Sequence, residues 1–148
     1  MLRVPDPDRF ADARPEPRAT ASGPGRVLVA VYAIFALGAT ARAGVQIATR
    51  FDDAPLAYLL SAFAAVVYVL ATVALAGSGS IWWRVALGAC SVELVGVLTV
   101  GLLSVFDPAA FPDATVWSAF GRGYLFVPLV LPVIGLAWLR RTAPGRRP

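Results

Sequence analysis

Apolar residues gather in four long stretches that are separated by short polar segments. The stretches cover about residues 27–49, 56–76, 85–105 and 120–139. Each comes close to the roughly 20 residues that an α-helix needs to cross the hydrocarbon core of a bilayer. The pattern therefore predicts an all-α, polytopic membrane protein, with four transmembrane helices in an antiparallel bundle over residues 27–141.

Polar and aromatic residues support these boundaries. Asp53 and Pro55 suit the start of the second span, as a capping residue and a first-turn residue without a backbone donor. All the tryptophans fall at predicted span ends, where amphipathic rings prefer the membrane interface; they are Trp82, Trp83, Trp117 and Trp138. Within the fourth span, Pro128 and Pro132 predict a bend near its middle.

The two ends of the chain are polar and rich in proline and arginine. Residues 1–26 and 142–148 lack the apolar content needed to bury a core, so we expect disordered tails. Arginines near the spans favour one side of the membrane: Arg26, Arg84, Arg140, Arg141, Arg146 and Arg147, against Arg50 and Arg122 on the other. Because basic residues are retained in the cytoplasm, both termini are predicted to be cytoplasmic and the protein to lie in the cell membrane.

The amino-acid composition argues against several classes of function. Apolar residues make up 58% of the chain, above the roughly 45–50% of soluble domains. The net charge of +4 is explained by membrane topology, so no nucleic-acid partner is expected. The chain has no histidine and only one cysteine, Cys90. This excludes the paired thiols of four-helix quinone-linked disulfide enzymes and disfavours a zinc site, and we expect no catalytic residues, metal or cofactor.

Two ionisable residues lie well inside predicted spans, where a charge is costly: Arg42 in the first and Glu93 in the third. Counted from each span centre, Arg42 lies about 6 Å outward and Glu93 about 3 Å inward, so their backbones differ by roughly 9 Å in depth. Two states are open for Glu93: ionised and paired with Arg42, or protonated and bonded to Tyr68, which lies near its depth on an antiparallel helix.

Small and polar residues recur at helical spacing in every span, which predicts the faces that pack together. These stripes are Gly38, Arg42, Gln46 and Thr49; Ala57, Ser61, Ala65, Tyr68, Thr72 and Ala76; Ala89, Glu93, Gly96, Val100 and Ser104; and Gly121, Tyr124, Pro128, Pro132 and Gly135. We expect an intramembrane polar cluster of Arg42, Glu93, Tyr68 and Gln46.

Four residues of the outer half suggest a polar vestibule that would attract an anion or a lipid headgroup: Arg42, Gln46, Arg122 and Tyr124. An alternative is that Arg122 extends to the surface, where Asp107, Asp113 or Asp53 neutralises it. We expect the loop over residues 106–119 to cover the helices, with a short interfacial helix as the alternative.

Three segments resemble small four-span integral membrane proteins of actinobacteria. They are Tyr32 to Gln46 (YAIFALGATARAGVQ), Ala54 to Tyr58 (APLAY) and Thr115 to Tyr124 (TVWSAFGRGY), and the resemblance spans about residues 27–141. It implies topology and source, but no functional residues. Small multidrug transporters also have four spans and a membrane carboxylate, but their essential Glu lies in the first helix, whereas Glu93 lies in the third.

We therefore expect a non-enzymatic integral membrane protein that acts as a structural or accessory subunit. Its partners would be the lipid bilayer and either further copies of itself or another membrane-protein subunit. The alternative is a small transporter or a lipid- or anion-binding bundle that uses Glu93 and Arg42. An enzyme is the least supported hypothesis, because the sequence shows no nucleophile with a base, no metal cluster and no phosphate-binding loop.

Overall fold

The computed structural model describes residues 23–145, which are helical or loop and contain no strand. Four α-helices follow each other along the chain: α1 (Gly23–Arg50), α2 (Pro55–Ala76), α3 (Ser80–Phe106) and α4 (Val127–Arg141). Three of them, α1, α2 and α3, are long and apolar enough to cross a membrane. A fourth span results only if α4 and the short helix before it count as one bent segment.

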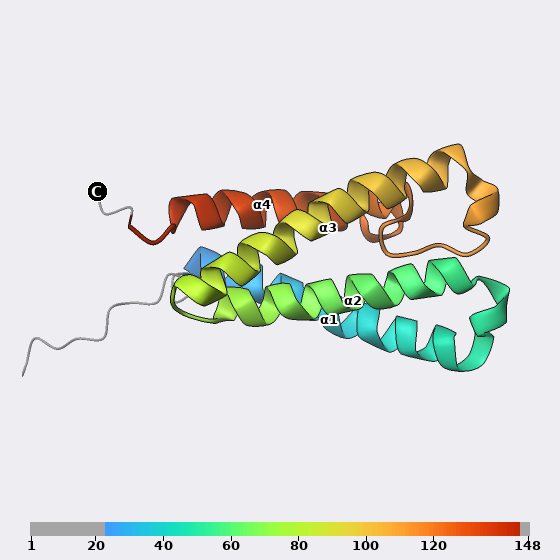
Figure 1. The fold of residues 1–148 in the computed structure, drawn as a ribbon, viewed down its shortest axis with the longest axis horizontal. Helices are drawn as coiled ribbons and strands as arrows, with labels where there is room; N and C mark the ends of the chain where they lie inside the picture. The colour runs from blue at the N-terminus through green and yellow to red at the C-terminus, as the bar shows by residue number, and fades with distance from the viewer. Residues whose placement is uncertain (1–22, 146–148) are drawn as a thin grey trace, which may run out of the picture.

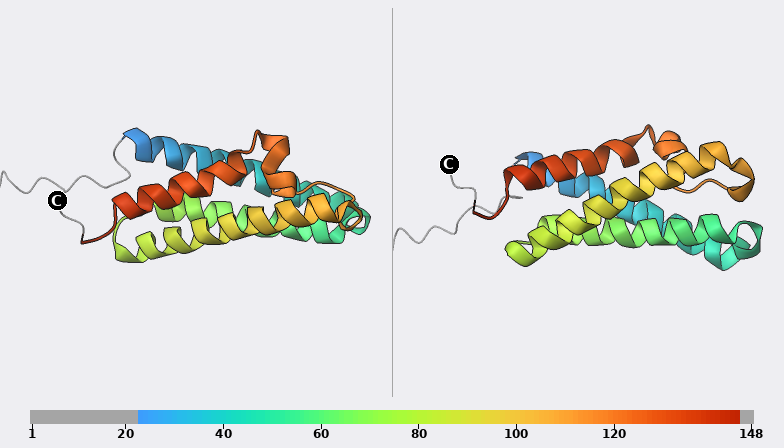
Figure 2. Two further views of the ribbon diagram at one scale, coloured as in Figure 1. Left: turned by 90° about the horizontal axis from the view of Figure 1, so that it is seen from above. Right: turned by 45° about the horizontal axis from the view of Figure 1, so that its top comes forward.

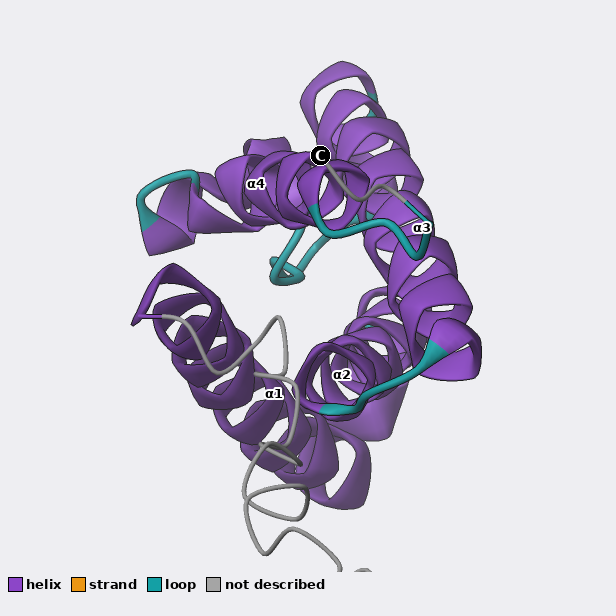
Figure 3. Cartoon of the chain, turned by 90° about the vertical axis from the view of Figure 1, so that its left-hand side faces the viewer, coloured by secondary structure: helices purple, strands orange, loops and turns teal. Residues whose placement is uncertain are grey.

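The helices form an elongated structure in which neighbours along the chain pack side by side (Figure 1). Seen end-on, α2 lies between α1 and α3, and α4 lies beside α3 (Figure 3). The start of α1, the α2–α3 turn and the end of α4 gather at one end of the molecule (Figure 2). The long loop after α3 lies at the opposite end, beside the α1–α2 connection.

The first helix begins earlier than its apolar pattern predicts. The predicted tail ends at Arg26, but α1 already starts at Gly23, with Pro24 in its first turn. Proline is tolerated there because first-turn amides have no partner within the helix. The predicted disorder of residues 1–22 and 146–148 lies outside the described residues.

The start of α2 differs from the expected capping arrangement. Its N-cap is Ala54, and no side chain caps it. Asp53 belongs instead to a short 3-10 helix (Phe51–Asp53) and pairs with Arg50 at 3.6 Å, with both side chains exposed. The cap predicted for Asp53 is therefore wrong, whereas Pro55 does occupy the first turn of α2.

The fourth apolar stretch is not one continuous helix over residues 120–139. A 3-10 segment, η5 (Ser118–Tyr124), is bent by 100° relative to α4, and only the 15 residues of α4 form an α-helix. The break contains four non-glycine residues with left-handed backbone angles: Ala119, Phe120, Leu125 and Phe126. It precedes Pro128, which lies in the first turn of α4, so the predicted bend is placed too far along the chain.

Side-chain contacts on α3 hold this irregular segment. Ser104 accepts a hydrogen bond of 2.8 Å from the Ala119 amide, which otherwise has no helical partner. The ring of Phe120 lies so close to Gly101 that a Cβ atom there would be 2.5 Å from it. These contacts offset the cost of left-handed backbone at residues other than glycine.

Trp117 corrects the prediction that all tryptophans lie at the membrane interface. Its side chain is 1% exposed and packs within the core, against Gly96 of α3. Trp83 has a different role at the other end, where its indole donates a 2.9 Å hydrogen bond to the Leu139 carbonyl and ties the start of α3 to the end of α4. Trp82 is 40% exposed.

Candidate functional site

Glu93 occupies the centre of the helical core. Its side chain is fully buried, and its Oε2 atom accepts a hydrogen bond of 2.8 Å from the hydroxyl of Tyr32 on α1. The same hydroxyl lies 3.4 Å from the Cys90 sulfur, one turn before Glu93 on α3. Gly135 of α4 packs against both, since a Cβ atom there would lie 3.0 Å from the sulfur and 3.2 Å from the hydroxyl. Three helices therefore enclose this carboxyl group.

Further residues around Glu93 come from α2 and the loop after α3. The Tyr68 hydroxyl accepts a 3.2 Å hydrogen bond from the Trp117 indole, and both side chains are almost completely buried. Tyr68 also lies close enough to Glu93 for an electrostatic interaction and a weak hydrogen bond, whose geometry falls outside the usual limits. Within those limits, Glu93 Oε1 has no hydrogen-bond partner among the described residues. We call Tyr32, Tyr68, Cys90, Glu93 and Trp117 the buried network.

Tyr32 is the partner of Glu93 that the sequence did not reveal. The predicted partner, Tyr68, does lie beside the carboxyl, but the hydrogen bond comes from Tyr32. The buried face of α1 consists of Gly25, Leu28, Tyr32, Ala36, Ala43 and Gln46. Tyr32 precedes Gln46 by 14 residues, which places it about 40° from it around the helix axis. The helical spacing between Tyr32 and Gln46 could therefore have indicated that Tyr32 faces the core, but the predicted stripe began only at Gly38.

Arg42 does not contact Glu93. Its guanidinium donates one hydrogen bond to the Tyr124 hydroxyl and another of 3.0 Å to the carbonyl oxygen of Ala114. No ion pair joins Arg42 to a carboxylate among the described residues. The expected intramembrane polar cluster is therefore two separate groups, with Glu93 and Tyr68 in the core and Arg42 beside the loop and η5.

The helix faces explain this separation. Of the predicted stripe on α1, only Gln46 is buried, whereas Arg42 is half-buried and both Gly38 and Thr49 are exposed. Arg42 lies about 80° from Tyr32 around the helix, so the two side chains cannot point to the same place. The stripes on α2 and α3 do face inward in large part, and Ala57, Ser61, Ala65, Tyr68, Ala89, Glu93 and Val100 are buried.

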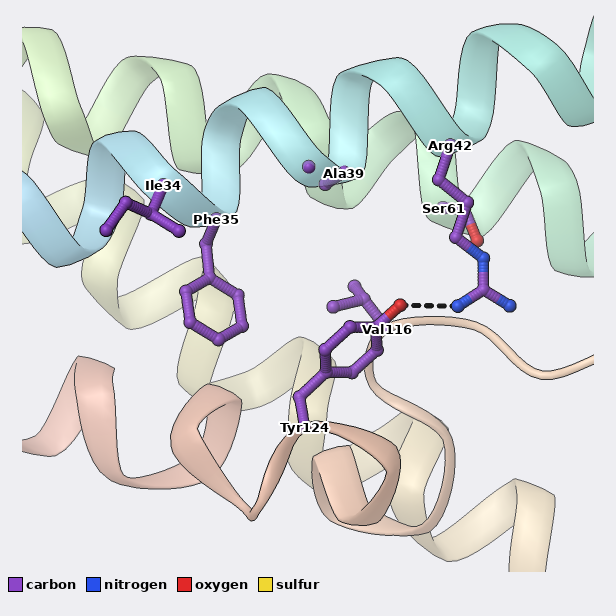
Figure 4. Close-up of a pocket in the computed structure, with 8 residues that line it drawn as sticks. Ile34, Phe35, Ala39, Arg42, Ser61, Val116 and Tyr124 are labelled. Carbon is purple, nitrogen blue, oxygen red and sulfur yellow. Dashed lines mark hydrogen bonds between the residues drawn. The ribbon is translucent and has the colours of Figure 1, made fainter.

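A cavity of about 210 Å³ lies beside Arg42, between α1 and η5 (Figure 4). Arg42 and Tyr124 meet at one end of it, and the rings and methyl groups of α1 form most of its wall. The full lining is Ile34, Phe35, Gly38, Ala39, Arg42, Ser61, Val116 and Tyr124. The Ser61 hydroxyl donates to the Ala57 carbonyl 2.9 Å away. The cavity is therefore apolar except around Arg42 and Tyr124.

The predicted outer vestibule is only partly assembled. Arg42 and Tyr124 line the cavity together, but Gln46 and Arg122 do not. Gln46 is buried, and its Oε1 atom has no hydrogen-bond partner among the described residues, while Arg122 is exposed on η5. Two of the three aspartates expected near Arg122 have other contacts, since Asp113 accepts a 2.8 Å hydrogen bond from Tyr58 and Asp53 pairs with Arg50.

The described residues offer little for catalysis or metal binding. No group of three His, Cys, Asp or Glu side chains that could hold a metal ion occurs among residues 23–145. Cys90 is buried against Tyr32 and Gly135, away from any of the cavities described. No protein-family model, curated protein or solved structure matches the chain. The resemblance to four-span actinobacterial proteins stays a prediction.

Proposed function

We propose that this chain is a non-enzymatic integral membrane protein that serves as a structural or accessory subunit. The observation that carries the proposal is the enclosure of Glu93. A carboxyl group on α3 that is held by Tyr32 of α1 and flanked by Tyr68 of α2, which itself accepts a hydrogen bond from Trp117, links the helices of one core. Buried polar groups of this kind can fix which helix faces meet, because a misplaced helix would leave the carboxyl unpaired in an apolar interior.

The alternative, a transporter that moves a proton or substrate through Glu93, has less support. A carrier residue needs access to one side of the membrane at a time, whereas Glu93 is fully buried. Further cavities lie between α2 and α3, beside Phe63 and Val95, and between α1 and α4, beside Val27 and Val130. Neither these nor the cavity at Arg42 includes Glu93 in its lining.

The proposed orientation has both termini in the cytoplasm. The start of α1, the α2–α3 turn and the end of α4 lie at one end of the molecule, which carries Arg26, Arg84, Arg140 and Arg141. The opposite end carries Arg50 and acidic side chains such as Asp53 and Asp113. The end with more basic residues is the one expected to stay inside the cell. Reporter fusions at each terminus and in the 106–119 loop test this orientation.

Liposome reconstitution tests the structural role of Glu93. We expect no Glu93-dependent proton flux with a pH-sensitive dye trapped inside. Glu93→Gln should keep the fold, because the amide oxygen can accept the Tyr32 hydrogen bond and the amide nitrogen can donate to Tyr68. Glu93→Leu should destabilise it by about 1–3 kcal/mol, because the Tyr32 hydroxyl loses its carboxyl acceptor in the core and keeps only the weak contact with the Cys90 sulfur. Proton flux that is lost in Glu93→Gln liposomes would overturn the proposal in favour of transport.

Assembly provides the second test. Purification in a mild detergent, followed by measurement of the mass of the complex and of co-purifying proteins, should give a stoichiometric partner or a defined oligomer. A monomer that leaves the membrane without a bound protein would contradict the subunit role. Such a result would not bear on the structural role of Glu93, which the stability of Glu93→Gln and Glu93→Leu tests separately.

A further inference from the structure

One face of α1 carries two neighbouring cavities. The cavity of about 210 Å³ follows Ile34, Phe35, Gly38, Ala39 and Arg42. A second cavity of about 500 Å³ lies next to it, between α1 and α4, and follows Pro24, Val27, Leu28 and Val31. The steps of three and four residues place all of them along a single stripe of the helix. Across from α1, Tyr124 lines the first cavity and Leu125, the next residue in the chain, lines the second.

This stripe forms a groove with a polar end and an apolar length. We call it the α1 groove, defined by the residues that line the two cavities. Between Arg42 and Val27 it runs about 22 Å along the helix, against roughly 30 Å for the whole hydrocarbon core. Its mouth opens sideways, because Val27, Ile34 and Gly38 are exposed on the outside of the structure. A molecule dissolved in the bilayer can therefore reach it.

The positive charge at the polar end lacks a counter-ion among residues 23–145. Arg42 uses two of its five N–H groups, toward Tyr124 and Ala114, which leaves three free donors. Neither cavity has an acidic residue in its lining. Asp113, next to Ala114, already accepts hydrogen bonds from the Tyr58 hydroxyl and the Ala114 amide. An anion would complete the coordination of Arg42.

The depth of Arg42 selects the kind of anion. Arg42 lies eight residues, about 12 Å, before the end of α1 at Arg50. The headgroup of a two-chain phospholipid stays at the membrane surface, whereas a carboxylate is small enough to enter between α1 and η5. Arginine binds a carboxylate through two parallel hydrogen bonds. The two cavities are lined by apolar side chains except for Arg42, Ser61 and Tyr124, which suits the hydrocarbon chain of such an anion.

We propose that the α1 groove binds the anion of a long-chain fatty acid. Its carboxylate lies against Arg42, near Tyr124, and its hydrocarbon tail follows Ile34 and Val31 toward Val27. The site shares no residue with the buried network, which it contacts through Phe35, whose ring centroid lies 5.7 Å from that of Tyr68. Failure of this proposal therefore leaves the structural role of Glu93 unaffected, and the reverse also holds.

Direct binding to the full-length protein in phosphatidylcholine nanodiscs tests the proposal. The probes are palmitate, hexadecanol and dipalmitoyl-phosphatidylglycerol, measured at alkaline pH so that the fatty acid is ionised. Native mass spectrometry and competition with a labelled palmitate report the stoichiometry and affinity. We expect saturable one-to-one binding of palmitate, and at least tenfold weaker binding of hexadecanol, which lacks the charge.

Two pairs of variants separate the head of the site from its tail. Arg42→Gln should weaken palmitate binding by about tenfold or more, whereas Arg122→Gln, exposed on η5 outside the groove, should not. Gly38→Leu should block the groove while Arg42 stays in place. Gly44→Leu is its control, because a Cβ atom at either glycine meets no neighbour within 4 Å and Gly44 lines neither cavity.

Three results would overturn the proposal. Equal affinity for palmitate and hexadecanol would mean that only apolar contact with the groove is measured. Displacement of palmitate by phosphatidylglycerol at equal concentration would assign the groove to phospholipid. Unchanged palmitate binding in both Arg42→Gln and Gly38→Leu would place the bound fatty acid elsewhere on the protein.

Discussion

The indole of Trp117 donates a hydrogen bond of 3.2 Å to the hydroxyl of Tyr68. This bond joins the loop after α3 to the middle of α2, and both side chains are almost completely inaccessible. A connecting segment thus contributes to the core of the helical structure. The loop is part of the folded structure that surrounds Glu93, so its removal should affect the whole protein.

Replacement of Trp117 by phenylalanine should lower the stability of the protein. The change leaves the Tyr68 hydroxyl without its donor and creates a gap beside Gly96, which together should cost about 2–4 kcal/mol. Unfolding in mixed detergent micelles, followed by circular dichroism, measures the loss. Trp82→Phe serves as the control, because Trp82 is 40% exposed and should tolerate the change. Equal stability of the two variants would refute the assignment of Trp117 to the core.

Replacement by alanine should lower the stability of the protein at one glycine of α3 but not at another. At Gly96 a Cβ atom would lie 2.5 Å from the Trp117 ring, so Gly96→Ala should displace the indole and cost about 1–3 kcal/mol. At Gly88 a Cβ atom meets nothing within 4 Å, so Gly88→Ala should be neutral or slightly stabilising. The same unfolding assay compares them. A stabilising Gly96→Ala would show that Trp117 does not pack on α3.

Tyr32 and Glu93 should be energetically coupled. Tyr32→Phe removes the donor of the 2.8 Å hydrogen bond and should destabilise the protein by about 1–3 kcal/mol. In combination with Glu93→Leu, the second change should cost much less than it does alone, because the polar partners are then both removed. A double-mutant cycle measured by unfolding gives the coupling. Additive losses would mean that the hydrogen bond contributes nothing to folding.

Cys90 should be unreactive in the folded protein. Its side chain is fully buried between Tyr32 and Gly135, so a thiol reagent can reach it only after the core opens. The chain has one cysteine, so labelling reports a single site. We expect slow labelling in mild detergent and fast labelling in sodium dodecyl sulfate, followed by mass spectrometry. Ser78→Cys in a Cys90→Ala background should label rapidly, since Ser78 is exposed in the α2–α3 turn, outside the apolar helices. Rapid labelling of Cys90 itself under native conditions would contradict its place in the core.

Hydropathy predicted the first three membrane-spanning helices because a helix that crosses lipid needs a long apolar run, which a single sequence displays directly. The observed helices α1, α2 and α3 cover the predicted ranges and extend beyond them at several ends. The same reasoning failed for residues 120–126, which are equally apolar. Their left-handed backbone depends on contacts with Ser104 and Gly101 of α3, and hydropathy carries no information about those contacts.

The sequence predicted Glu93 and Tyr68 as candidate site residues, but it missed Tyr32 and did not predict which side chains pair. Depth along the membrane normal follows from counting residues, so the stagger of Arg42 and Glu93 was available from the sequence. The rotation of α1 about its own axis was not, because apolar residues surround both faces of a helix in lipid. That rotation turns Tyr32 toward Glu93 and Arg42 toward Tyr124. Trp117 was misplaced for a related reason, since a loop has no helical period to indicate where its side chains point.

The break before α4 has a consequence for the surrounding lipid. The 15 residues of α4 span only about 22 Å, whereas α1, with 28 residues, spans about 42 Å. The apolar surface of the protein is therefore taller on one flank than on the other. Lipids next to α4 have to thin or tilt to cover it, at a cost of a fraction of a kcal/mol for each ångström of mismatch. A protein with such an uneven hydrophobic belt should deform the bilayer around it asymmetrically.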